Sequence, residues 1–204
     1  MAATRLSDTG MQSVTVHLTA ADRAVQLAAD VRNGLTATPK ELPPKWFYDE
    51  AGGQLFDKIT RLPEHYPTRR ERAVLTEHAD EIAAFSRADT LVELGSGTSE
   101  KTRLLLDALH GAGTLRRFVP FDVDEAVLRQ VAATMPLAHP TLQVTALVGD
   151  FDHHLGHLPR AEAGWWCFSA ARSATCARPS GTSSCPGCGP RRLTGTCCCS
   201  APTW

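Results

Sequence analysis

The most informative part of the chain reads Thr90-Leu91-Val92-Glu93-Leu94-Gly95-Ser96-Gly97-Thr98-Ser99-Glu100-Lys101-Thr102. A short apolar run ends in a Gly-Ser-Gly turn, and a helical pattern follows from residue 99 to residue 109. Glycines at such a turn let the backbone bend sharply and approach a ligand, because no Cβ atom stands in the way. The stretch therefore predicts a buried strand, a ligand-binding turn and a helix.

The same alternation continues after this turn. Residues 117–121 form a second apolar run, residues 124–133 a helical pattern, and residues 142–148 a third apolar run. Strands that alternate with helices are typical of a parallel sheet with crossover helices. We therefore expect an α/β domain over residues 89–160.

The sequence before the turn is mostly helical in pattern. We expect a helix over residues 20–35, and a longer one that begins at Thr68. One face of the first helix carries Ala24, Leu27, Ala28 and Val31, and the buried stripe of the second is predicted to be Val74, Leu75, His78, Ile82 and Phe85. We expect a helical section over residues 20–88, preceded by a flexible N-terminus over residues 1–19.

Charge and hydropathy exclude some classes of partner. The net charge is −1 at pH 7, which provides no basic surface for nucleic acid or for an anionic membrane. We find no signal peptide and no apolar run long enough to span a bilayer. We therefore expect a cytoplasmic monomer.

Two acidic positions favour a nucleoside ligand. Asp122 ends the second strand, where its carboxylate could accept hydrogen bonds from ribose hydroxyls, and Asp150-Phe151 ends the third, where they could hold an adenine. The turn lacks the third glycine of a pyrophosphate fingerprint and follows the acidic Glu93. These features suit S-adenosylmethionine better than NAD, although each one alone is also typical of a tight turn or a solvated cap.

Five blocks of sequence resemble the actinobacterial L-histidine Nα-methyltransferases of ergothioneine biosynthesis. They are residues 35–40 (LTATPK), 43–49 (PPKWFYD), 55–64 (LFDKITRLPE), 93–102 (ELGSGTSEKT) and 118–124 (FVPFDVD). The resemblance runs from about residue 27 to residue 159. It implies a class I, Rossmann-like methyltransferase that transfers methyl groups from S-adenosylmethionine to the α-amine of L-histidine, giving the betaine hercynine.

The resemblance also implies the site residues. Those that match the family's cofactor contacts are Gly95, Lys101, Asp122, Asp150 and Phe151. Tyr48 matches an aromatic residue near the substrate, and His65, beside Tyr66, stands where the family has a tyrosine that contacts histidine. The alternative for His65 and Tyr66 is loop packing beside Pro67, and Lys101 could be an ordinary helix-surface lysine.

The character of the sequence changes near residue 160. All seven cysteines lie between Cys167 and Cys199. A one-base shift of the reading frame can turn residues 164–168 into Leu-Val-Val-Phe-Leu, an apolar strand of the kind that the family carries next. We therefore expect residues 161–204 to be an out-of-frame, disordered tail. A zinc site through Cys185 and Cys188 is the alternative, but three consecutive cysteines are poor ligand spacing, and we expect no metal.

These expectations describe a truncated methyltransferase with three parallel strands and no measurable turnover. Two other functions stay open. One is another S-adenosylmethionine-dependent methyltransferase that acts on a different amine, and the other is a non-catalytic fragment that binds cofactor or zinc.

Overall fold

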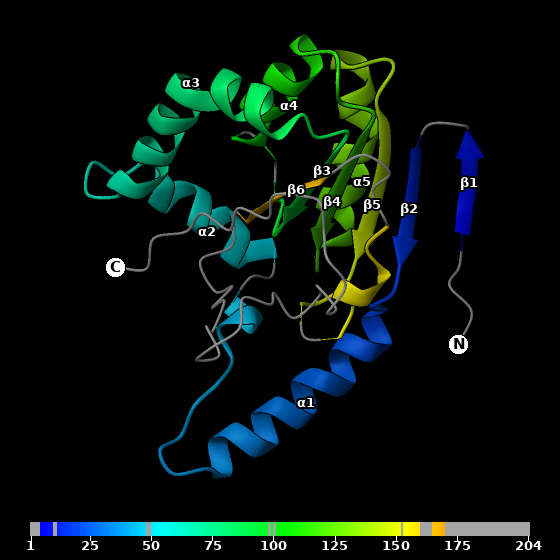
Figure 1. Cartoon of the computed structure of the whole chain (residues 1–204). Helices are drawn as coiled ribbons and strands as arrows, with labels where there is room; N and C mark the ends of the chain where they lie inside the picture. Colours follow the sequence, from blue (N-terminus) through cyan, green and yellow to red (C-terminus); the bar gives the residue numbers. More distant parts are fainter. Residues whose placement is uncertain are drawn as a thin grey trace, which may run out of the picture. The chain divides into compact units, whose positions relative to one another are not determined.

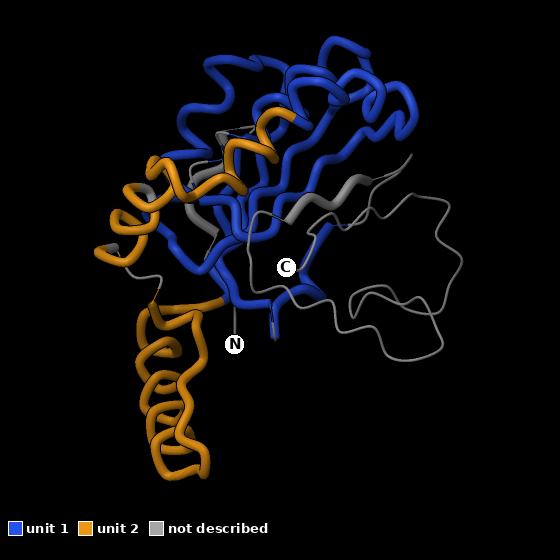
Figure 2. The backbone as a smooth tube through the Cα atoms, turned by 90° about the vertical axis from the view of Figure 1, so that its left-hand side faces the viewer, with its two compact units in different colours: residues 1–17, 74–204 blue, residues 18–73 orange. Residues whose placement is uncertain are grey.

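The structure is a computed structural model, and it describes residues 5–9, 12–47, 50–97, 99, 101–151, 153–159 and 165–169. The chain divides into two compact units, one of residues 18–73 and one of residues 1–17 with 74–204 (Figure 2). The second boundary lies earlier than the expected one at residue 89. The reason is that Leu75, Ala79 and Ala83 belong to the apolar core of the sheet unit.

One mixed sheet forms the centre of the larger unit (Figure 1). Its strands are β1 (Arg5–Thr9), β2 (Gln12–Val16), β3 (Thr90–Leu94), β4 (Arg117–Asp122), β5 (Gln143–Val148) and β6 (Trp165–Ser169). They are ordered β1-β2-β5-β4-β3-β6, and every neighbouring pair is parallel except β1 and β2. The chain runs outward from β3 through β4 to β5, and then returns to place β6 on the other side of β3.

Helices connect these parallel strands and cover the core. The helices of this unit are the second half of α3 (Tyr66–Ser86), α4 (Thr102–Gly111), α5 (Glu125–Ala138) and the short 3-10 helix η2 (Leu155–His157). α4 leads from β3 to β4, and α5 leads from β4 to β5 (Figure 1). Asp124 caps α5 by accepting hydrogen bonds from the backbone of Ala126 and Val127. The predicted α/β, Rossmann-like fold class is confirmed.

The expected flexible N-terminus is wrong for residues 5–9 and 12–16. These residues form β1 and β2, and β2 pairs with β5 along its whole length. Val14 and Val16 lie on the same side of the strand, because side chains alternate along it, and both pack against the main apolar core. Burial of this short alternating pattern holds the N-terminal strand in the sheet.

The expectation that the parallel sheet ends at three strands is also wrong. Residues 165–169 form β6, which pairs with β3 from Thr90 opposite Trp165 to Leu94 opposite Ser169. Residues 165–168 form a continuous apolar run, which is typical of a strand in a parallel sheet. The remaining residues between 161 and 204 lie outside the described part of the chain, so the out-of-frame origin of the tail stays a prediction.

The smaller unit is helical, as the sequence predicts. It contains α1 (Ala20–Thr36), the 3-10 helix η1 (Pro44–Phe47), α2 (Glu50–Thr60) and the first turns of α3. Thr19 and Asp22 form a capping box at the start of α1. At its end the chain folds back so closely that a Cβ atom on Gly34 would lie 2.0 Å from the Glu41 carbonyl oxygen.

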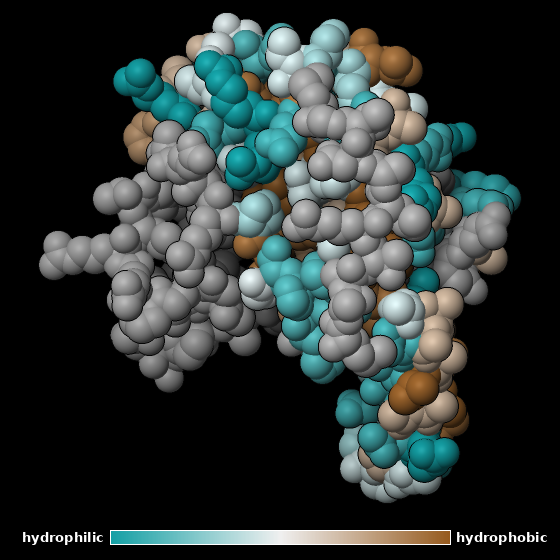
Figure 3. Space-filling view, turned by 90° about the vertical axis from the view of Figure 1, so that its right-hand side faces the viewer, coloured by the Kyte–Doolittle hydropathy of each residue, from teal (hydrophilic) through white to brown (hydrophobic). Residues whose placement is uncertain are grey.

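The predicted buried stripe of α3 is wrong in part, because Leu75 is buried whereas Val74 and Phe85 are exposed. The apolar face of α1 is also largely exposed. Leu27 is 40% exposed, Ala24 and Ala28 are exposed, and Gly34 is the buried residue among those described in this helix. The returning segment contacts the last turns of α1, where Trp46 Nε1 donates to Asp30 Oδ2 at 2.8 Å. Apolar and hydrophilic side chains are therefore mixed on the surface of α1, the lowest part of Figure 3.

Candidate functional site

The turn after β3 has a backbone that suits close approach. Gly95, Gly97 and Ser99 have φ angles of 69°, 47° and 55°, in the left-handed region that glycine adopts most readily. The amide of Gly95 donates to the Phe121 carbonyl at 2.8 Å, which ties the turn to the end of β4. The buried strand and the turn are found as predicted, and the helix begins at Thr102 rather than at residue 99.

Asp122 holds this turn from the neighbouring strand. Its Oδ2 atom accepts a hydrogen bond from the Gly97 amide at 3.0 Å, and its Oδ1 atom accepts one from the Asp124 amide at 3.1 Å. Burial raises the pKa of the Asp122 carboxyl, although the hydrogen bonds from Gly97 and Asp124 act in the opposite direction. The carboxylate thus has a fixed orientation at the carboxyl end of β4.

The end of β5 meets the same point. The amide of Gly149 donates to the Asp122 carbonyl at 2.9 Å, and the rings of Phe121 and Phe151 stack with centroids 5.5 Å apart. A Cβ atom on Gly149 would lie 3.0 Å from the Phe121 ring, so a larger residue would not fit without movement. The structure therefore brings Gly95, Asp122 and Phe151 to one edge of the sheet.

Asp150 lies buried beside these residues and is held by its own segment. His153 donates to Asp150 Oδ1 from its backbone amide at 2.8 Å, and the His153 Nδ1 atom lies 3.0 Å from the same oxygen. Burial favours a raised pKa for Asp150, but the hydrogen bonds from His153 outweigh it and lower the pKa below its usual value. The group is therefore an ionised acceptor.

Glu93 is not among the site residues predicted from the sequence. Its side chain is buried, and it accepts hydrogen bonds from Ser99 Oγ at 2.6 Å and from Thr102 Oγ1. Burial raises its pKa to about 8. The sequence signal for this contact is an acidic residue inside an apolar strand, followed after the turn by Ser99 and Thr102, whose hydroxyls can donate to it. Glu93 closes the base of the turn.

Lys101 and Ser96 complete the turn. Lys101 lies in the first residues before α4, partly buried, and its charge lowers the pKa of Glu93 against the larger effect of burial. Ser96 Oγ is buried and has no hydrogen-bond partner within the described residues. An unsatisfied buried hydroxyl is costly, so it fits a site whose ligand supplies a hydrogen bond.

The residues predicted to bind the substrate lie in the smaller unit or outside the described part of the chain. Tyr48 lies outside the described residues. His65 is buried, its Nε2 atom lies 3.0 Å from Thr68 Oγ1, and the Phe56 ring meets it edge-on. Tyr66 is exposed at the first position of α3. These contacts agree with the packing alternative for His65 and do not test a contact with substrate.

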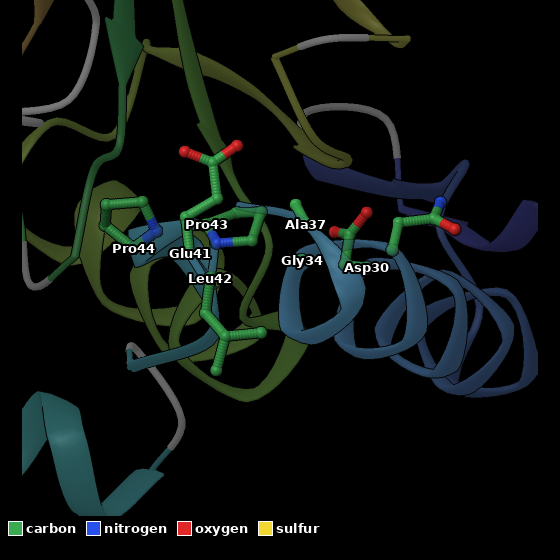
Figure 4. A pocket seen from close by; sticks show the side chains of 8 residues that line it. Asp30, Gly34, Ala37, Glu41, Leu42, Pro43 and Pro44 are labelled. Atoms are coloured by element: carbon green, nitrogen blue, oxygen red, sulfur yellow. The ribbon is translucent and has the colours of Figure 1, made fainter. Parts of the chain in front are cut away.

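The smaller unit also contains a hollow of about 530 Å³ at the end of α1 (Figure 4). Its lining residues are Asp30, Asn33, Gly34, Ala37, Glu41, Leu42, Pro43 and Pro44. None of the predicted site residues lines it.

In the part of the chain that the structure describes, no three His, Cys, Asp or Glu side chains are arranged to hold a metal ion, and no helix is long and apolar enough to cross a membrane.

Comparison with known proteins finds a family described as "Histidine-specific methyltransferase, SAM-dependent", which matches residues 27–171. The histidine N-alpha-methyltransferases of Mycolicibacterium smegmatis and Mycobacterium tuberculosis are 57% and 55% identical to this chain, and each match covers 72% of it. The same matches cover 46% of each relative, so the chain spans about half the length of these relatives. Human N-acetylserotonin methyltransferase shows a weak structural likeness, with a TM-score of 0.39, 18% identity, and coverage of 71% of this chain and 39% of that protein.

Proposed function

Because the chain belongs to the family of histidine-specific, SAM-dependent methyltransferases, we propose that it carries the cofactor-binding part of an enzyme that methylates the α-amine of L-histidine. The observation that supports this most is the meeting of Gly95, Asp122 and Phe151, with Asp150 beside them, at the carboxyl ends of three parallel strands. In sheets of this kind, ligands bind beyond these ends, at the point where the strand order reverses. Here that point is β3.

Each residue at this edge of the sheet suits a different part of the cofactor. Asp122 is placed to accept hydrogen bonds from ribose hydroxyls, and the ionised Asp150 with the Phe151 ring suits an adenine. Gly95 and Lys101 suit the amino-acid end, where the start of α4 favours a carboxylate. S-adenosylmethionine supplies an electrophilic methyl group on a sulfonium when it is bound.

The protein contributes orientation to the methyl transfer. The attacking α-amine must be neutral, so each transfer requires the loss of one proton from the amine. A site that orients the amine and excludes water needs no covalent intermediate. We assign Tyr48, His65 and Tyr66 to the histidine side of the reaction, on the basis of the family's pattern. From the sequence, we further propose that the enzyme is monomeric and cytoplasmic and has no nucleic-acid partner. Size-exclusion chromatography tests the monomeric state.

Calorimetric titration with S-adenosylhomocysteine tests the cofactor site directly. We expect the chain to bind this product analogue, and Asp122→Ala to weaken binding by about tenfold or more, because a hydrogen-bonded carboxylate is lost. Asp80→Ala, an exposed change on α3, is the matched control and should leave the affinity unchanged. Absence of binding by the unaltered chain would refute the proposal.

A further inference from the structure

Four histidine rings form a cluster in the sheet unit, and two of them, His153 and His154, contact Asp150. His17 follows β2, and its amide donates to the Val148 carbonyl at 2.9 Å. Its ring stacks on that of His157 with centroids 3.9 Å apart, and the His154 ring lies 6.2 Å from it. Burial lowers the pKa of His17, and the neighbouring His157 and His154 lower it further. The neutral form of the His17 imidazole is therefore favoured.

His154 makes a contact that depends on its protonation state. Its Nδ1 atom lies 3.1 Å from the backbone nitrogen of Asp150, which is a hydrogen-bond donor. The same Nδ1 atom lies 3.5 Å from Asp150 Oδ1, a contact that is attractive only when Nδ1 carries a hydrogen. Because the shorter contact has a donor on the backbone side, Nδ1 must carry a lone pair, and the ring proton must lie on Nε2.

We infer that His154 is a positioning residue for Asp150, and that its neutral imidazole is required for tight binding of the adenosyl cofactor. The inference rests on the proposed function, in which Asp150 meets the adenine. When Nδ1 gains a proton, the Asp150 amide loses its acceptor and the new N–H is attracted to the Asp150 carboxylate instead. The carboxylate then leaves the orientation that His153 gives it, and cofactor affinity falls.

The groups around His154 bear on whether its Nδ1 atom gains a proton. The titratable groups that face it are His17 at the end of β2, His157 in η2, and His153 with Asp150 in its own segment. The His154 ring is therefore in contact with the three other histidine rings and with the Asp150 carboxylate. A Cβ atom on Gly149 would lie 2.8 Å from the His154 Cβ atom, so the imidazole is closely packed against the backbone of the cofactor segment.

The test compares two variants of the full chain by calorimetric titration with S-adenosylhomocysteine, at about pH 5.5 and about pH 8, on either side of the usual histidine range. His154→Asn places a non-titrating oxygen near the position of Nδ1, whereas His154→Ala removes the acceptor. We expect His154→Ala to bind about tenfold more weakly than the unaltered chain at the higher pH, because the buried Asp150 amide loses its hydrogen-bond acceptor. His154→Asn should bind within about threefold of the unaltered chain there, and should lose most of the acid-induced weakening.

The controls separate this inference from the proposed function. His78→Asn, on the surface of α3, should keep the affinity and the pH profile of the unaltered chain. If His154→Asn weakens on acidification as much as the unaltered chain does, the inference is wrong, although the cofactor site stands. If the unaltered chain binds nothing at either pH, the proposed function fails. In that case the ¹⁵N chemical shift of His154 still tests the geometry, because a protonated Nδ1 at the higher pH would contradict the assigned contact.

Discussion

At the scale of single residues, the buried carboxyl of Glu93 makes stability depend on pH. In the folded chain it keeps its proton up to about pH 8, whereas its ordinary pKa is 4.5. Between these two values unfolding releases a proton, so the free energy of unfolding decreases as the pH rises. The loss is on the order of 5 kcal/mol across the whole interval.

Glu93→Gln should remove this dependence, because an amide resembles the protonated carboxyl and can still bond to the hydroxyls of Ser99 and Thr102. We expect equal stability near about pH 4.5, and a more stable variant near about pH 8. Urea denaturation at several pH values measures the difference. Glu81→Gln, an exposed change on α3, should retain the slope of the unaltered chain. Equal slopes for both variants would show that Glu93 is ionised in the folded state.

Gly149 is the second position where one atom matters. Gly149→Ala would place a Cβ atom 2.8 Å from the His154 Cβ atom and 3.0 Å from the Phe121 ring. We expect a loss of about 1–3 kcal/mol in the free energy of unfolding, together with weaker binding of S-adenosylhomocysteine. Gly156→Ala, where the added atom meets nothing within 4 Å, is the control in the same segment. Equal thermal melting of the two variants would contradict the expected crowding.

At the scale of elements, the fold of the smaller unit depends on the close return of the chain after α1. Gly34→Ala would bring a Cβ atom to 2.0 Å from the Glu41 carbonyl oxygen, which is part of the backbone and has little freedom to move. We expect a loss of about 2 kcal/mol or more and rapid proteolysis within residues 18–73.

Gly53→Ala in α2 is the helical control, since its added atom meets nothing within 4 Å. It should be neutral, or stabilising by about 0.5–1 kcal/mol, because alanine favours a helix. Limited proteolysis followed by mass spectrometry locates the cleavage in both variants. Protection of Gly34→Ala equal to that of Gly53→Ala would show that the return of the chain at Gly34 adjusts without cost.

The elements that the sequence predicts best are those with a strong local pattern. Residues 90–94, 117–121 and 142–148 combine an apolar run with a turn or helix signal, and β3, β4 and β5 follow them closely. The alternation at Val14 and Val16 is only a weak strand signal, and β2 forms because it pairs with β5 and its valines pack against the core. The contact of Glu93 with Ser99 and Thr102 depends on the path of the turn, which the sequence alone does not specify.

At the scale of the whole molecule, we expect the reading frame after residue 160 to determine whether the chain can methylate histidine. We expect no trimethylated histidine from the chain as written, and formation of this product when the gene is reframed by one base from codon 164 onward. Mass spectrometry of reactions with S-adenosylmethionine and histidine measures both. Turnover by the chain as written would refute the out-of-frame interpretation, as would an inactive reframed enzyme that still binds the cofactor analogue.

The pairing of β2 with β5 sets an order of events during synthesis. β2 is complete when the ribosome has joined residue 16, but its partner strand ends at residue 148. Chains are synthesised from the N-terminus at about 5–20 residues per second. The edge of β2 that pairs with β5 therefore has no partner strand for several seconds. A chaperone that holds short extended segments would have its opportunity in this interval, before the rest of the sheet is translated.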